Sequence, residues 1–176
     1  NMSDRKQMLQ DALMAQRKML IDATGKRGED IPQAFTPYKE VLDVYDEGLE
    51  LPDDVTIIWP DDNYGYMKRL SSPKEQKRSG RSGGYYHSSY LGKPHDHLWM
   101  NTTSPTLMYE ELRKAYDLTA DRIWLLNAGD IKSCEFAVDY FLTMAFDIDS
   151  FSFERAANYR TEWLCGMLGD DYRVEY

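Results

Sequence analysis

Two uninterrupted apolar segments constrain the fold of this chain more than any other feature. Residues 55–59 and 123–126 are apolar or β-branched at successive positions, without the alternation of a half-exposed strand. Strands of this kind are covered on both faces, which is typical of a parallel sheet with helices packed on either side. The two segments therefore predict an α/β fold.

Helical segments alternate with these strands along the chain. Apolar residues recur in them with a period of 3.6, and Ser3, Gly25 and the Ser104-Pro105 pair are typical helix-start and helix-stop residues. Strand followed by helix predicts parallel strands joined by right-handed crossovers. The expected helices cover residues 3–26, 38–47, 104–117, 132–146 and 153–168, and a third, shorter strand covers about 84–90.

Three strands are too few to close a barrel. A (β/α)8 barrel needs about 250 residues, whereas this chain has 176. We therefore interpret residues 1–176 as one arc of a partial (β/α)8 TIM barrel, with parallel strands and crossover helices. Such an arc has two open strand edges, and open edges pair with other strands. The isolated arc is therefore expected to associate with itself as a homodimer.

The charge balance excludes two classes of partner. Thirty acidic and twenty-one basic residues give a net charge of −9, whereas binding to phosphate backbones needs a basic face. Nucleic acid and membrane surfaces are therefore not expected as partners. No apolar run of about 18 residues and no signal peptide is present, although an export signal could lie upstream. Cys134 and Cys165 lack CxxC spacing, so neither a zinc ribbon nor a disulfide framework is expected.

Polar segments follow the predicted strands. They occupy residues 60–65, 85–90 and 127–130, and they contain carboxylates, amides, an imidazole and aromatic rings. In α/β enzymes the chemistry lies at the carboxyl ends of the strands. The pattern therefore indicates part of an active site.

Three carboxylates are candidates for catalysis. Asp61 and Asp62 follow a strand, and because the side chains of consecutive residues diverge there, at most one can face a bound molecule. Glu40 lies at the start of a predicted helix. Ordinary explanations exist for all three, because acidic residues favour the first turn of a helix and aspartates after a proline commonly form turns. The residue pattern alone leaves these alternatives open.

Four ordered motifs resemble those of glycoside hydrolase family 115, the xylan α-1,2-glucuronidases. The resemblance implies a multidomain protein with a central (β/α)8 catalytic domain, of which this chain looks like the middle and later part. One departure is Arg81, which stands where the family usually has a second glycine. The motifs are Pro37-Tyr38-Lys39-Glu40-Val41; Trp59-Pro60-Asp61-Asp62-Asn63-Tyr64-Gly65; Gly83-Gly84-Tyr85-Tyr86-His87 with Tyr90 and Gly92; and Ile123-Trp124-Leu125-Leu126-Asn127-Ala128-Gly129-Asp130 with Lys132 and Glu135.

The resemblance assigns roles to individual residues. It implies Glu40 and Asp61 as the catalytic pair, with Asp62 turned away to fix its loop through backbone donors. We expect Asp130 to finish the strand that begins at Ile123, as a structural residue at the site. The expected substrate-binding residues are Tyr38, Asn63, Tyr86, His87, Asn127 and Lys68.

Structural alternatives exist for several of these residues as well. His87 could instead be a core histidine, Asn127 could form a turn, and Lys68 belongs to a basic stretch that could be a solvated loop. The segment His95-Asp96-His97 has alternating potential metal ligands, but no further ligand accompanies it. We therefore expect no metal and no cofactor.

The implied activity is hydrolysis of α-1,2-linked glucuronic acid, or its 4-O-methyl ether, from xylan side chains with inversion. The implied substrates are glucuronoxylan and aldouronic oligosaccharides, and the implied location of the full-length protein is secreted or periplasmic. The isolated arc is expected to be inactive because part of the site lies upstream. The alternative is a non-catalytic α/β module that binds acidic sugars or associates with itself.

Overall fold

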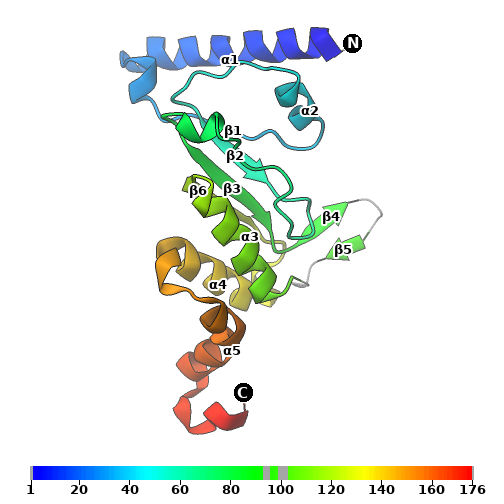
Figure 1. Ribbon diagram of the computed structural model, residues 1–176, viewed down its shortest axis with the longest axis vertical. Helices are drawn as coiled ribbons and strands as arrows, with labels where there is room; N and C mark the ends of the chain where they lie inside the picture. Colours follow the sequence, from blue (N-terminus) through cyan, green and yellow to red (C-terminus); the bar gives the residue numbers. More distant parts are fainter. Residues whose placement is uncertain (1, 93–95, 99–102, 176) are drawn as a thin grey trace.

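A four-stranded parallel sheet forms the centre of the molecule (Figure 1). The computed structural model describes residues 2–92, 96–98 and 103–175. All three neighbouring strand pairs are parallel, which confirms the predicted α/β class. In spatial order the strands are β1 (Ala34–Phe35), β2 (Thr56–Pro60), β3 (Ser82–His87) and β6 (Ala120–Asn127).

The helices occupy the positions that the periodicity predicts, with ends that differ by at most three residues. In Figure 1, α1 and α2 lie at one end of the elongated molecule, α3 lies across the sheet, and α4 and α5 extend toward the other end. α3 connects β3 to β6, as expected of a crossover helix. The bounds are α1 (Met2–Thr24), α2 (Glu40–Asp46), α3 (Pro105–Asp117), α4 (Glu135–Phe146) and α5 (Phe153–Leu168).

Local capping explains where two of the helices begin. The Ser104 side chain accepts a hydrogen bond from the backbone N–H of Leu107, and proline follows it in the first turn of α3. The Ser152 side chain accepts from the backbone N–H of Arg155 at the start of α5. Each cap satisfies a backbone donor that has no partner inside the helix.

The segment predicted as one strand over 84–90 is two elements. β3 ends at His87, and the chain then enters an antiparallel hairpin of β4 (Tyr90–Gly92) and β5 (Asp96–Leu98). The break occurs because the backbone N–H groups of Ser88 and Ser89 both donate to the carbonyl oxygen of Asn127, so the parallel ladder ends there. β1, with only two residues, has too short a pattern to be predicted.

The core lies between the sheet and α3, α4 and α5. All five residues of β2 are buried, as the continuous apolar pattern predicts. β6 differs from the prediction, because Ile123 and Leu125 on one of its faces are 39% and 45% exposed. Trp124 and Leu126, on the opposite face of β6, pack against the core, and β6 is also the outermost strand of the described sheet. The main core residues include Ile57, Trp59, Tyr86, Met108, Leu112, Tyr140, Phe141 and Met144.

Two positions in the segment that leads to His87 favour glycine, but only one of them is a glycine. A Cβ added to Gly83 would lie 2.1 Å from the carbonyl oxygen of Ile123, so the close approach of β3 and β6 requires glycine. Arg81 has a φ of 52°, a conformation that favours glycine. Its guanidinium binds the Asp121 carboxylate with an Nε–Oδ1 distance of 2.7 Å, which offsets part of that strain.

Candidate active site

The carboxyl ends of β2, β3 and β6 meet at one rim of the sheet. Pro60 is paired with Tyr85 and His87 with Asn127, so the residues that follow β2 lie beside the ends of β3 and β6. A pocket of about 300 Å³ opens there. Its lining includes Asn63, His87 and Tyr90. The rim therefore brings together the polar segments that the sequence predicted to meet.

Asp61 and His87 form a buried pair at this rim. The Asp61 carboxylate is 0% exposed and the His87 side chain is 2% exposed, and their Oδ1 and Nδ1 atoms are 2.6 Å apart. The other oxygen, Oδ2, accepts from the backbone N–H of His87 at 3.1 Å, and Oδ1 also accepts from the backbone N–H of Asn63 at 3.0 Å. Both carboxylate oxygens are therefore occupied inside the protein.

This burial corrects the sequence-based role of Asp61. A carboxylate with no exposed surface and three internal donors cannot contact a sugar in this conformation. Its contacts instead fix the position of the His87 ring. The Asp61 contact occupies Nδ1, which leaves Nε2 as the ring nitrogen without a partner in the described part of the chain.

Three tyrosine rings surround the His87 imidazole. Tyr38 lies parallel to it at a centroid distance of 5.8 Å, Tyr85 is at 4.5 Å, and Tyr90 meets it edge-on at 5.9 Å. Tyr85 and Tyr90 are rim residues to which the sequence motifs assigned no role. Tyr85 could have been found from strand geometry, because residues two apart in a strand point to the same face.

The same geometry corrects the prediction for Tyr86. Tyr86 lies between Tyr85 and His87 in β3, so its side chain points to the opposite face, which packs against the helices. It is fully buried in the core, and its hydroxyl donates to the carbonyl oxygen of Gly65 at 3.0 Å. Tyr86 therefore supports the loop from behind and does not face the rim pocket.

Hydrogen bonds hold the predicted amides at the rim. The Tyr38 hydroxyl donates to Asn63 Oδ1 at 2.6 Å, and Asn127 Nδ2 donates to the Tyr85 hydroxyl at 2.7 Å. Burial raises the pKa of the Tyr38 phenol above its ordinary value, so this hydroxyl keeps its proton at neutral pH. The amides and phenols thus form a fixed polar frame around His87.

Asp62 fastens the loop after β2. Its Oδ1 accepts from the backbone N–H groups of Tyr64 and Tyr66 at 3.0 and 3.2 Å, which are the backbone contacts expected of it. Burial alone would raise the pKa of the Asp62 carboxyl, but hydrogen bonds from Lys68 and from these two amides hold the pKa below its usual value.

The prediction that Lys68 binds substrate does not agree with its contacts. Lys68 Nζ lies 2.7 Å from Asp62 Oδ2, and the lysine side chain is 73% exposed. Its charge is balanced within the loop and is not directed into the rim pocket. Lys68 is therefore a loop residue in this structure.

Glu40 and Asp130 are both exposed. Glu40 is the first residue of α2 and follows Tyr38, one of the rings around His87, by two positions in the chain. Within the described residues, neither carboxylate has a hydrogen-bond or ion-pair partner. β6 ends at Asn127, so Asp130 does not finish that strand as expected, although its backbone carbonyl accepts a hydrogen bond from the Ser133 hydroxyl at 3.2 Å. The Glu40 carboxylate is free to meet a bound molecule.

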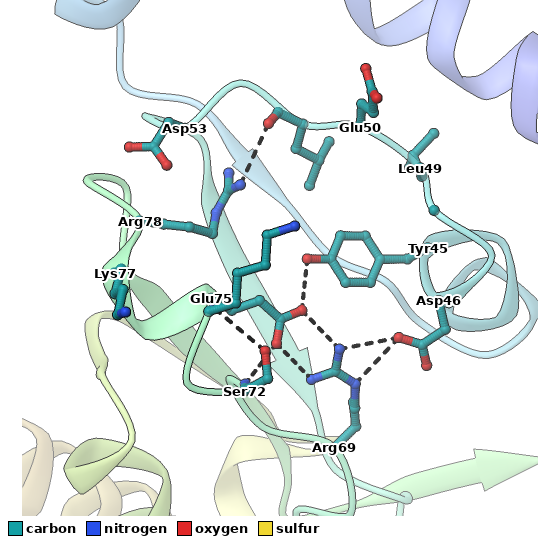
Figure 2. Close-up of a pocket in the computed structure, with 13 residues that line it drawn as sticks. Tyr45, Asp46, Leu49, Glu50, Asp53, Arg69, Ser72, Glu75, Lys77 and Arg78 are labelled. Atoms are coloured by element: carbon teal, nitrogen blue, oxygen red, sulfur yellow. Dashed lines mark hydrogen bonds and ion pairs between the residues drawn. The ribbon is translucent and has the colours of Figure 1, made fainter.

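A larger cavity of about 790 Å³ lies away from this rim (Figure 2). It is bounded by the end of α2 and by the segments that lead into the amino ends of β2 and β3. Figure 2 shows the Arg69 guanidinium between the carboxylates of Asp46 and Glu75, with the Tyr45 hydroxyl also donating to Glu75. The charges at the centre of this cavity, those of Arg69, Asp46 and Glu75, are thus paired with one another. Residues at the amino ends of barrel strands serve stability, whereas catalysis is found at the carboxyl ends.

The described residues contain no group of three or more histidine, cysteine, aspartate or glutamate side chains arranged to hold a metal ion. The residues 93–95 lie outside the described part, as do the side chains of Asp96 and His97, so the segment around His95 is not part of this finding. Within the described part, no helix is long and apolar enough to span a membrane.

Comparison with known proteins gives two consistent findings. The sequence profile of glycosyl hydrolase family 115 matches residues 1–175. A solved structure of a family GH115 4-O-methyl-α-glucuronidase, described as specific for decorated arabinogalactans, superposes with a TM-score of 0.93 at 41% sequence identity. That match covers 99% of this chain and 23% of the other chain, so this chain spans about a quarter of that protein's length. No curated protein matches the chain.

Proposed function

The chain belongs to glycosyl hydrolase family 115, and on this basis we propose that its full-length protein removes α-linked glucuronic acid, or the 4-O-methyl ether, from polysaccharide side chains. The chain supplies one arc of the catalytic barrel. The observation that carries the proposal is the frame of Tyr38, Asn63 and His87 at the rim, with the exposed Glu40 two residues along the chain from Tyr38. Glycoside hydrolysis requires carboxyl groups that can reach the sugar, and an exposed carboxylate such as Glu40 can supply one of them.

Glu40 is the catalytic carboxylate of this chain in the proposed mechanism. Hydrolysis with inversion uses one carboxylic acid to protonate the leaving oxygen and one carboxylate to activate water. Asp61 is enclosed, so it acts through His87 as a positioning residue. The second catalytic carboxylate then comes from the part of the protein outside this chain, about 6.5–9.5 Å from Glu40 if the reaction inverts.

The polar frame binds the sugar in this proposal. Tyr38, Asn63 and Asn127 present hydroxyl or amide groups at the rim, and these groups pair with sugar hydroxyls. His87 lines the rim pocket, and because Asp61 occupies Nδ1, Nε2 is the ring nitrogen assigned to the sugar in this proposal. A frame whose members already hold one another loses little conformational entropy when the sugar binds.

Two polymers are candidate substrates. Xylan is favoured by the resemblance of the four motifs to xylan α-1,2-glucuronidases. Decorated arabinogalactan is favoured by the described specificity of the similar solved structure. Both are extracellular polymers, so we propose a secreted or periplasmic location.

The test uses the full-length protein with glucuronoxylan, aldouronic oligosaccharides and glucuronidated arabinogalactan, and measures release of the uronic acid. The Glu40→Gln variant is expected to lower kcat about 10²–10⁴-fold or more, because general acid–base catalysis usually contributes a factor of this size. Glu47→Gln makes the same substitution at an exposed position just beyond the other end of α2 and should retain the wild-type rate.

Three outcomes are informative. A near-normal rate for Glu40→Gln would remove Glu40 from the chemistry. Binding of the oligosaccharide by the wild-type protein without release of uronic acid would favour the alternative of a sugar-binding module. The anomer that first appears in proton NMR spectra distinguishes inversion from retention.

A further inference from the structure

Lys39 is a cation of the Pro37–Val41 motif that has no assigned role, and its side chain lies near the rings of Tyr38 and Tyr90. It lies between Tyr38 and Glu40, immediately before α2. Its Nζ atom is 5.1 Å from the centroid of the Tyr38 ring and 5.7 Å from that of Tyr90. These are two of the rings that surround His87, so the ammonium lies at the edge of the same frame.

Two other cations, both in the segment that follows β2, have acidic partners. Lys68 pairs with Asp62, and Arg69 pairs with Glu75 and with Asp46. Within the described residues, no carboxylate lies in ion-pair distance of Lys39. The phenol groups of Tyr38 and Tyr90 raise the pKa of Lys39 above its ordinary value, so it carries its full charge at neutral pH.

The backbone at Lys39 is strained. Its φ of 53° and ψ of −125° lie in a region that side chains other than glycine rarely adopt. Hydrogen bonds from the N–H of Val41 to the Tyr38 carbonyl and from the N–H of Leu42 to the Lys39 carbonyl hold the turn. Backbone preference alone would favour glycine here. Strain of this kind is concentrated at ligand sites, because surrounding contacts must impose it.

We propose that Lys39 binds the carboxylate of the uronic acid whose glycosidic bond lies at Glu40, and so selects an acidic sugar over a neutral one. The inference rests on the proposed function, which supplies the sugar. A uronate brings a second negative charge close to the catalytic carboxylates, and like charges at such distances repel. The Lys39 ammonium offsets this repulsion and donates a charge-assisted hydrogen bond to the substrate carboxylate.

The test compares matched substrates in the full-length protein. One is an oligosaccharide with a glucuronic acid side chain, and the other carries the methyl ester of the same uronic acid. Lys39→Met is expected to lower kcat/KM for the acid about 100-fold, mainly through KM, and to change kcat/KM for the ester less than about tenfold. Lys39→Arg keeps the charge and should recover part of the discrimination.

A matched control is Lys77→Met, which removes an exposed lysine near the amino end of β3 and should not alter either substrate's kinetics. Thermal unfolding checks that the Lys39 variants remain folded. Equal losses on acid and ester for a folded Lys39→Met variant would overturn the proposal, because the side chain would then act on both substrates alike.

A binding measurement separates this inference from the proposed function. Calorimetric titration with free glucuronic acid and with glucose requires no catalysis. If the wild-type protein binds glucuronic acid more tightly and Lys39→Met loses that difference, Lys39 is the carboxylate-binding residue even where no uronic acid is released. Unchanged discrimination in the variant, or no discrimination in the wild-type protein, contradicts the assignment.

Discussion

Substitution of Asp61 by asparagine tests the buried pair at the rim. The Asp61 carboxylate has no exposed surface and accepts from three donors: His87 Nδ1 and the backbone N–H groups of His87 and Asn63. Asparagine keeps one acceptor oxygen and places an NH2 group where the other oxygen was. At least one buried N–H then faces a donor and loses its bond. An unsatisfied buried donor costs about 1–3 kcal/mol, and more when the lost partner was charged, so we expect a loss of about 2–4 kcal/mol in folding free energy.

Asp62→Asn provides the matched comparison. It makes the same change at the next residue, where the side chain is 18% exposed and water can replace a lost contact. We therefore expect a cost of about 1 kcal/mol or less for Asp62→Asn. Thermal unfolding of the full-length protein, followed for the catalytic domain, should show a drop of several degrees for Asp61→Asn and a much smaller one for Asp62→Asn.

Activity separates a positioning role for Asp61 from a catalytic one. If Asp61 acts through His87, the losses of kcat/KM for Asp61→Asn and His87→Phe should not add in the double variant, because both remove the same oriented ring. Additive losses would show that Asp61 acts independently of His87. An Asp61→Asn protein with wild-type thermal stability would refute the reasoning from burial.

Three further predictions concern stability and assembly. Burial alone would raise the pKa of Glu75, but hydrogen bonds from Arg69, Ser72 and Tyr45 bring the pKa to about 2. The contribution of ionised Glu75 to folding stability is therefore complete above about pH 5 and is lost as the pH falls toward 2. Glu75→Gln should lose about 1–2 kcal/mol at pH 7, after allowance for solvent screening, and should flatten the acid side of a stability curve; an unchanged curve would contradict this. Gly83→Ala should lower thermal stability markedly, because its Cβ would lie 2.1 Å from the Ile123 carbonyl oxygen, whereas unchanged melting would show that β3 and β6 can separate without cost. The isolated 176-residue chain should release no uronic acid. It should sediment as a dimer or larger species at tens of micromolar, because the edge of β6 is open and Ile123 and Leu125 are exposed. A monomer, or released uronic acid, would argue against the arc interpretation.

The sequence by itself determined the order and nature of the main elements. Helix periods, caps such as Ser104 and the continuous apolar strands depend on residues a few positions apart, so a local pattern carries the information. The parallel order followed from the alternation of strands and helices, and the rim followed from the rule that parallel strands end together. The four motifs added the family, which the match over residues 1–175 confirms.

Strand alternation also determines which side chains of β3 share a face. Tyr86 and His87 are consecutive residues in β3, so only one of them can face the rim, and Tyr85 shares the face of His87. The shortest strand, β1, and the hairpin of β4 and β5 were not predictable in the same way. Their pairing depends on partners elsewhere in the chain, and their own residues are too few to show a period.

Only the tertiary structure decided which carboxylate is enclosed and which cation is free. Asp61 and Asp62 are equivalent in a local pattern, but Asp61 meets His87, 26 positions away, while Asp62 meets Lys68 within its own loop. In the same way, Lys68 is the nearer cation in sequence to the two aspartates, whereas Lys39 reaches the aromatic frame. Burial and charge pairing depend on contacts between segments far apart in the chain, and the fold alone brings those segments together.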